Sequence, residues 1–263
     1  MAFVLVMVSC SSLSESGQGG DTAGLRERRR LTVAFVDADG GDRAIEVRKG
    51  AEVRFAAFNE RDPIIALDLV DAAAVDTADE GLVAALVVGD DLSAAEGLRA
   101  SGVSLLVISS RAALGEGAWR SVAGPDAVAA AMAGVDEGVL GEDAVAEGLA
   151  NGSRAICACT VITGDESRAA GDFVDGYEAA NNSAPGLWSA EGYDSAGLVV
   201  EAVRLAFLDR MGIDGYLRSQ PTPYVGVTKP VRFGSDGELT DQPVFVIEAS
   251  GDQLSLSDTI TGE

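Results

Sequence analysis

The sequence predicts an α/β fold in which helices cover both faces of a parallel sheet. Short, continuous apolar segments alternate along the chain with segments whose apolar residues recur at helical spacing. Strands that are apolar on both faces are typical of a buried parallel sheet. Apolar residues make up 47% of the 263 residues, so the chain has enough material for one large domain or two smaller lobes.

The alternation is clearest in the first half of the chain. Four apolar runs read as strands, and two intervening segments read as helices. The expected strands are 31–36, 64–70, 82–88 and 103–108, and the expected helices are 43–59 and 94–100.

The second half repeats the pattern and then changes character. We expect four helices and one strand, of which the last helix has the strongest apolar stripe. The helices are 125–133, 142–150, 166–180 and 191–208, and the strand is 155–162. The tail reads as β segments 224–233 and 243–249 around the turn 235–238, which is a hairpin signal.

Composition excludes several functions. The chain has 42 acidic residues, 19 basic residues and no histidine, which gives a formal charge of −23. Without imidazole there is no Ser-His-Asp triad, no Cys-His dyad and no histidine metal site. The charge repels phosphate backbones, which argues against nucleic-acid binding. The glycines form no phosphate-binding loop and no nucleophile elbow, so we expect neither an enzyme nor a cofactor.

The aspartates 37–42 faintly resemble a calcium loop. An EF-hand needs glycine at the sixth loop position and glutamate at the twelfth, where this chain has Asp42 and Arg48. We therefore expect no metal site there.

The N-terminus contains a candidate lipidation site at Cys10. A short apolar run, 2–8, precedes the cysteine, and the polar stretch 11–22 that follows reads as a flexible tether. Residues 7–10 resemble a bacterial lipobox, in which the cysteine becomes the acylated N-terminus. The alternative is a partly apolar N-terminus with an ordinary thiol.

The remaining cysteines, Cys157 and Cys159, fall in the expected strand 155–162. Alternate residues on one strand hold their Cα atoms too far apart for a good disulfide, although a loop at that point would remove the objection. We favour two small apolar side chains on one strand face over a redox role.

Polar residues follow the expected strands at the edge where open parallel sheets bind ligands. Asp90 and Asp91 could face a metal or a cationic ligand, although a solvated turn is the simpler interpretation. Ser93, Ser109 and Ser110 follow the same strand ends, where hydroxyl groups commonly bind the carboxylate or hydroxyl groups of small ligands.

In its order of motifs, the chain resembles the type I periplasmic substrate-binding proteins of branched-chain amino acid ABC transporters, the leucine-binding protein-like family. The "GYD" start of a late helix, at Gly192, is the most specific element. The matching stretches are 31–41, 49–52, 56–59, 87–93, 106–110, Pro185, Ala190, 192–195, Gly226, 231–233 and 236–238.

The resemblance implies two Rossmann-like lobes with parallel sheets that close on a ligand by hinge motion. Residues 31–124 and 186–221 would form the first lobe, and 125–185 and 222–263 the second, after a signal and tether in 1–30. The implied protein is a lipid-anchored solute-binding component of an ABC importer, on the outer face of the cytoplasmic membrane. Its partners would be a branched-chain or related amino acid, an ABC permease and, through the anchor, the membrane.

The resemblance also implies ligand-binding positions. Ser93 matches the serine that binds the ligand's α-carboxylate, and Arg111 to Ala113 match a loop of backbone and threonine contacts. Ala113 stands where the family has that threonine, so one hydroxyl is missing.

The chain is shorter than this family. On the order of 80–100 residues are missing between Ala133 and Gly148, judged from a lobe of ordinary domain size. The second lobe is therefore expected to be reduced, and a sheet that loses strands exposes unpaired edges. The alternative function is a degenerate paralogue that acts as a non-transporting sensor or interaction module.

Overall fold

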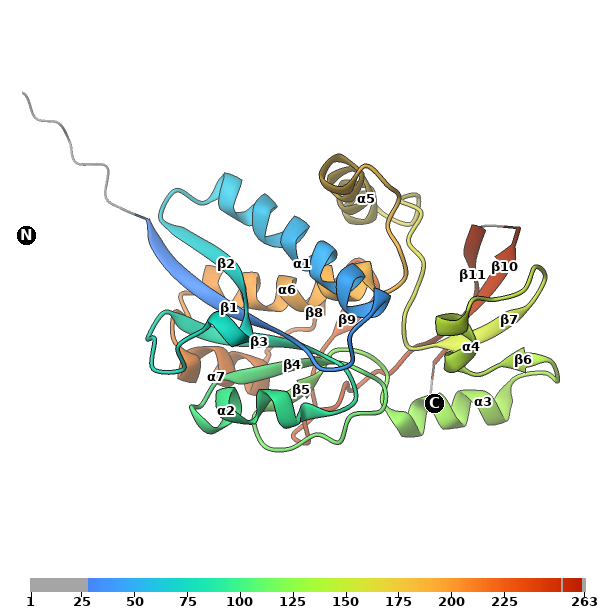
Figure 1. The fold of residues 1–263 in the computed structure, drawn as a ribbon, viewed down its shortest axis with the longest axis horizontal. Helices are drawn as coiled ribbons and strands as arrows, with labels where there is room; N and C mark the ends of the chain where they lie inside the picture. The colour runs from blue at the N-terminus through green and yellow to red at the C-terminus, as the bar shows by residue number, and fades with distance from the viewer. Residues whose placement is uncertain (1–27, 252, 262–263) are drawn as a thin grey trace, which may run out of the picture.

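Two β-sheets with helices packed around them make up the protein in the computed structural model (Figure 1), which describes residues 28–251 and 253–261. Cys10 lies outside the described residues. The first sheet has five parallel strands in the order β2-β1-β3-β4-β5. This arrangement confirms the α/β class. The strands are β1 Arg29–Asp37, β2 Ile65–Asp71, β3 Leu82–Val88, β4 Ser104–Ile108 and β5 Ala118–Arg120.

Helices cover both faces of this sheet because each central strand is apolar on both sides. Leu86 and Leu106 belong to a core cluster with residues of α1, α6 and α7, whereas Val87 and Leu105 belong to a second cluster with Leu98 of α2. The helices are α1 Asp42–Arg61, α2 Glu96–Ala100, α6 Ser189–Arg204 and α7 Arg210–Ser219, with short 3-10 turns at Ala72–Ala74 and Leu92–Ala95.

The second sheet has four strands in the order β11-β10-β7-β6 and is mostly antiparallel. Only β6 and β7 run parallel; β10 pairs antiparallel with both β7 and β11. A tight turn at Gly251, whose φ is +63°, joins β10 to β11 and so sets their antiparallel direction. The strands of the second sheet are β6 Val139–Leu140, β7 Arg154–Cys157, β10 Val244–Ser250 and β11 Gln253–Ile260, and the helices beside it are α3 Pro125–Gly134 and α4 Glu142–Glu147.

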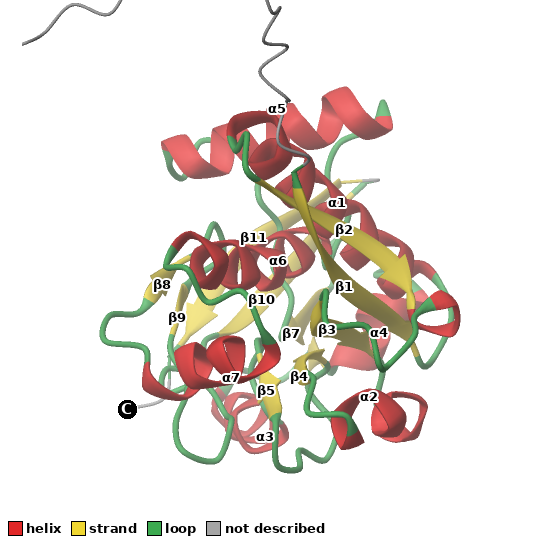
Figure 2. Cartoon of the chain, turned by 90° about the vertical axis from the view of Figure 1, so that its left-hand side faces the viewer, coloured by secondary structure: helices red, strands yellow, loops and turns green. Residues whose placement is uncertain are grey.

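Two further elements pack on the helices of the first sheet. Helix α5, Arg168–Asn181, contacts α1 and places Phe173 4.9 Å from Tyr193 of α6, measured between ring centroids. Figure 2 shows α5 beside α1, away from the first sheet. The hairpin of β8, Tyr224–Val225, and β9, Pro230–Val231, is tied to α6 by the loop between its strands.

The "GYD" motif at the start of α6 holds this scaffold together. A Cβ on Gly192 would lie 2.1 Å from the Val47 carbonyl oxygen, and one on Gly50 would lie 1.8 Å from that of Ser189, so α1 and α6 touch backbone to backbone. Asp194 accepts hydrogen bonds from the backbone N–H groups of Val227 and Thr228 and so fixes the β8–β9 hairpin. The motif therefore has a structural role in this chain.

The disulfide between Cys157 and Cys159 corrects the expectation for this segment. Strand β7 ends at Cys157, and the chain then bends, so the two Cα atoms lie 5.0 Å apart. On a continuous strand they would be about 6.6 Å apart. The expected strand 155–162 was therefore too long, and the interpretation of the cysteines as two unlinked apolar side chains is wrong.

The C-terminal region also differs from the expectation. A turn does form at 234–238, where Gly237 has a φ of +83° and Phe233 bridges Leu239. The flanking segments, however, do not pair with each other, since β9 pairs with β8 and β10 joins the second sheet. Helix α6 ends at Arg204, before Phe207, because Ala206 adopts a left-handed φ of +67°.

Among the described residues, no helix combines the length and hydropathy needed to cross a bilayer.

Candidate functional site

The carboxyl ends of β1, β3 and β4 meet at the edge of the first sheet that faces the second sheet. Asp39 follows β1, Asp90 follows β3, and Ser109 follows β4. Gly89 makes the close approach possible: its φ is +125°, and a Cβ there would lie 2.6 Å from Oδ1 of Asp39. The same carboxylate oxygen accepts a hydrogen bond from the Asp90 N–H at 3.2 Å.

These loops form one wall of a cleft of about 530 Å³ between the two sheets. Helix α4, the end of β7 and Leu254 of β11 form the opposite wall, and the segment before α6 completes it. The lining residues are Asp39, Gly40, Asp42, Arg43, Glu46, Asp90, Arg111, Glu142, Asp143, Val145, Cys157, Leu187, Trp188 and Leu254.

Carboxylates dominate the cleft. Six of its lining residues are acidic and only Arg43 and Arg111 are basic. Both arginines are already engaged: Arg43 forms an ion pair with Asp39, and Arg111 donates to Asp143 at 2.5 Å. This hydrogen bond raises the pKa of Arg111 further. The cleft is therefore electrostatically suited to a positively charged group.

Two contacts cross the cleft from wall to wall. The Ser110 hydroxyl donates to a carboxylate oxygen of Glu142, and the Arg111 guanidinium pairs with Asp143. The Glu142 side chain also accepts from the Ala158 N–H at 3.2 Å, so one carboxylate bonds both to the loop after β4 and to the segment after β7. The two walls of the cleft are therefore in direct contact in this structure.

Trp188 supplies the main aromatic surface of the cleft. It precedes α6 and has a left-handed φ of +74°, a rare and strained conformation for a bulky residue. Its side chain is nearly buried, and the Arg43 guanidinium carbon lies 5.6 Å from the indole ring centroid. Strain of this kind commonly occurs at binding sites, where the surrounding structure holds it in place.

Glu46 anchors α1 to the segment that leads to Trp188. Its carboxylate accepts from the Tyr177 hydroxyl, from the Gly186 N–H at 3.1 Å and from the Lys49 ammonium at 2.7 Å. Burial, together with the hydrogen bond to Glu46, raises the pKa of Tyr177, which stays a neutral donor.

The structure brings three of the predicted site residues together. Arg111 lines the cleft. Ser109 and Ser110 are buried beside it, and their hydroxyls are committed to Asp90 and Glu142 respectively. Ser109 also accepts from the N–H groups of Arg111 and Ala112 at 3.1 and 3.2 Å, so it shapes the loop.

The other two predicted residues lie outside the cleft lining. Ser93 is exposed, and its backbone N–H caps the turn by donating to Asp91 at 2.9 Å, while its hydroxyl donates to the same carboxylate at 2.9 Å. This capping lowers the pKa of Asp91. Ala113 is also exposed.

Arg120 supports the loop that carries Ser109 and Arg111. The guanidinium is almost fully buried and donates to the carbonyl groups of Ser109 and Ala112 and, at 2.8 Å, to Glu238. The turn at 236–238 therefore helps to hold the loop with Ser109 and Arg111 in place, because its Glu238 binds Arg120.

A buried group of charges lies behind the cleft. Glu191 of α6 accepts from the Thr160 N–H at 2.8 Å, and Asp194 and Lys229 are buried nearby. Burial raises the pKa of Glu191 to about 7, opposed by the charge of Lys229. Burial likewise raises the pKa of Asp194 and lowers that of Lys229.

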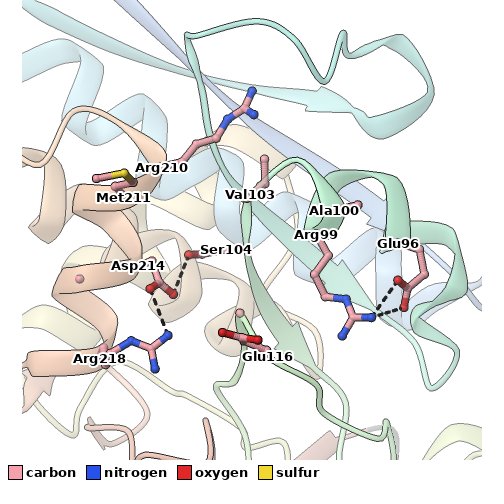
Figure 3. A pocket seen from close by; sticks show the side chains of 13 residues that line it. Glu96, Arg99, Ala100, Val103, Ser104, Glu116, Arg210, Met211, Asp214 and Arg218 are labelled. Carbon is pink, nitrogen blue, oxygen red and sulfur yellow. Dashed lines mark hydrogen bonds and ion pairs between the residues drawn. The ribbon is translucent and has the colours of Figure 1, made fainter.

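A second hollow, of about 710 Å³, lies at the amino ends of β4 and β5, away from the cleft (Figure 3). Its arginines are occupied: Arg99 pairs with Glu96, Arg218 pairs with Asp214, and Arg210 donates to four backbone carbonyls. This hollow is lined by as many basic as acidic residues, whereas acidic residues predominate in the cleft.

Sequence reasoning missed most of the cleft residues. Asp39 and Asp42 follow β1 just as Asp90 follows β3, so the same edge rule could have found them. Glu142 opens a short helix and Trp188 precedes a long one, and neither position has a sequence signal for binding.

Comparison with known proteins identifies the fold. No family model matches the sequence, and no curated protein matches it. Solved structures do match. The branched-chain amino acid substrate-binding protein LivJ from Streptococcus pneumoniae, in complex with isoleucine, has a TM-score of 0.64 and 13% identity, with 89% of this chain and 99% of that chain covered.

Two others agree. A possible leucine/isoleucine/valine-binding protein from Rhodopirellula baltica has a TM-score of 0.66 and 14% identity over 88% of this chain and 96% of that one. A solute-binding protein from R. palustris, in complex with benzoate, has a TM-score of 0.62 and 12% identity over 88% and 96%. The chain therefore has the fold of type I periplasmic binding proteins.

Proposed function

We propose that this protein is a solute-binding protein whose cleft between the two sheets takes a small ligand. The observation that carries the proposal is the cleft itself, which lies at the carboxyl ends of β1, β3 and β4 and has walls that contact each other through Ser110 and Glu142. Two lobes, 31–124 with 186–221 and 125–185 with 222–263, would close on the ligand by hinge motion. Helix α5 and the β8–β9 hairpin, which pack on α1 and α6, would move with the first lobe instead of the second.

The charges of the cleft favour a ligand with an ammonium group. Six carboxylates against two paired guanidinium groups attract a cation and repel a free carboxylate. Trp188 and the apolar residues Val145, Leu187 and Leu254 provide an apolar surface against which an aliphatic or aromatic side chain of a ligand can pack. An amino acid of the branched-chain type carries both an ammonium group and an aliphatic side chain, and these two attractions have to outweigh the repulsion between its carboxylate and the acidic lining.

Thermal melting against a ligand panel tests this function. The panel contains L-leucine, L-isoleucine, L-lysine, putrescine and benzoate, and the protein is made without residues 1–27. A ligand at a hundredfold excess over Kd stabilises the folded state by about 2.7 kcal/mol. For a chain of this size that corresponds to a rise in Tm of roughly 5–10 °C. No rise with any ammonium compound would contradict the proposal.

The cellular setting is part of the proposal. We infer a lipid anchor at Cys10, a place on the outer face of the cytoplasmic membrane and an ABC permease as partner, so that the protein serves an importer. The Cys157–Cys159 disulfide supports this location, because disulfides persist in oxidising compartments outside the cytoplasm. Mass spectrometry of the mature protein should find diacylated Cys10 at the N-terminus; an intact Met1 would refute the anchor.

A second candidate is a non-transporting sensor or interaction module. It is favoured by the occupation of the predicted binding hydroxyls, since Ser93, Ser109 and Ser110 each donate to a carboxylate of the protein. A flat melting response across the panel would favour this candidate.

A further inference from the structure

The Cys157–Cys159 disulfide lies against the residue that links the two walls of the cleft. Cys157 lines the cleft, and its Sγ lies 3.8 Å from Oε1 of Glu142. The residue enclosed by the disulfide, Ala158, donates its N–H to the same oxygen at 3.2 Å. The other carboxylate oxygen of Glu142 accepts from Ser110 on the opposite wall. The disulfide loop and the wall-to-wall contact therefore share one carboxylate.

The bend at Ala158 accompanies the disulfide. Cys157 pairs with Phe245 of β10, and β10 continues to Val244, which would oppose Ala158 if β7 ran one residue further. Instead the chain bends, and the disulfide joins Cys159 to Cys157, with the Cys159 N–H 3.1 Å from the Cys157 Sγ. If β7 continued through Ala158, the Cα atoms of Cys157 and Cys159 would lie about 6.6 Å apart instead of 5.0 Å, so the bend that presents the Ala158 N–H to Glu142 and the disulfide occur together.

The far end of the loop is fixed to the first lobe. Directly after Cys159, the Thr160 N–H donates to Glu191 of α6. The loop is thus held between Glu142 on one side and Glu191 on the other. A change in its conformation has to alter one of these two contacts.

We propose that the Cys157–Cys159 disulfide is a positioning element that sets Glu142 for its contact with Ser110, so that reduction of the disulfide shifts the cleft toward an open state. A dithiol supplies two electrons and two protons: the S–S bond breaks, both cysteines become thiols, and the dithiol is oxidised to its own disulfide. The inference rests on the contacts of the cleft and not on the proposed ligand, so it can fail or succeed independently of the proposed function.

The experiment uses tryptophan fluorescence without any ligand. Trp188 lines the cleft, whereas Trp119 is buried in the core beside Phe233, so acrylamide quenching that changes with cleft opening reports Trp188. Quenching is measured on the oxidised protein and after reduction with dithiothreitol, with thiol labelling and mass spectrometry to confirm reduction. The Cys157→Ser/Cys159→Ser double variant reaches the same state without reductant.

Reduction is expected to shift the ratio of closed to open protein by roughly tenfold, the effect of losing one charge-assisted hydrogen bond, and so to raise quenching. The Glu142→Ala variant should show high quenching from the start and no further response to reduction. Glu147→Ala, on the same helix but exposed, is the matched control and should respond like the wild type.

Two results would overturn the proposal. One is equal quenching of the oxidised protein and of both disulfide-free forms. The other is a response to dithiothreitol that persists undiminished in Glu142→Ala, because the disulfide would then act through some other contact.

Discussion

Replacing Gly192 by alanine tests whether the backbone contact between α1 and α6 holds the scaffold. The added Cβ would lie 2.1 Å from the Val47 carbonyl oxygen, whereas an ordinary contact begins at about 3.4 Å, so the helices must separate by about 1.3 Å. Backbone atoms cannot rotate away as a side chain would. The consequence reaches the cleft, because α1 carries Asp42, Arg43 and Glu46 and α6 begins next to Trp188.

The expected loss follows from two opposing effects. Overpacking costs about 1–3 kcal/mol, and the rigid contact places Gly192→Ala at the upper end of that range. Alanine in place of glycine inside a helix contributes about 1 kcal/mol of stability. The net loss is about 2 kcal/mol, or roughly 4–8 °C in Tm.

Urea unfolding followed by circular dichroism measures this loss. Gly215 in α7 provides the matched control, because it is a helical glycine whose added Cβ would meet no described atom within 4 Å other than the backbone of its own helix and its chain neighbours. Gly215→Ala should therefore be as stable as the wild type or up to about 1 kcal/mol more stable. A Gly192→Ala variant that behaves like Gly215→Ala would refute the close contact.

Two further variants test the groups that surround the cleft. Because burial raises the folded-state pKa of Glu191 from 4.5 to about 7, the contribution of Glu191 to the free energy of unfolding should be fully present below pH 4.5 and be lost, by on the order of 3 kcal/mol, as the pH rises through 7. Glu191→Gln should flatten that profile in urea unfolding between pH 4 and 8, and an unchanged slope would contradict the buried carboxyl. Glu238→Ala leaves the buried Arg120 charge without its carboxylate and should cost about 3–5 kcal/mol, measured as a lower urea midpoint; a loss below 1 kcal/mol would show that Arg120 is not buried in this way.

Sequence patterns predicted the first sheet well because its strands are continuous apolar runs. The run at Leu82–Val88 is buried throughout, and the strand has those bounds. Helix α7 was missed because glycines interrupt it and only Ile213, Tyr216 and Leu217 are buried. Strand β11 was missed because serines alternate with its leucines and most of it is exposed, so it read as a polar tail.

The candidate site was only partly predictable because it is assembled from distant segments. Parallel strands bring Asp90, Ser109 and Arg111 to one edge, and that rule can be applied to a sequence. The opposite wall depends on how the reduced second sheet packs, and no local pattern places Glu142 across from Ser110. The disulfide was missed for a similar reason, since the end of β7 at Cys157 is set by the bend that follows it.

We propose that the cleft between the two sheets binds a small ligand through the ligand's ammonium group. Isothermal titration with three matched compounds tests it most directly: L-leucine, 3-methylbutylamine, which lacks only the carboxylate, and 4-methylpentanoate, which lacks only the ammonium group. The carboxylates of the cleft predict binding of the first two and none, or far weaker binding, of the third. Binding of 4-methylpentanoate as tight as that of L-leucine, or no binding of any of the three, would contradict recognition of the ligand through its ammonium group.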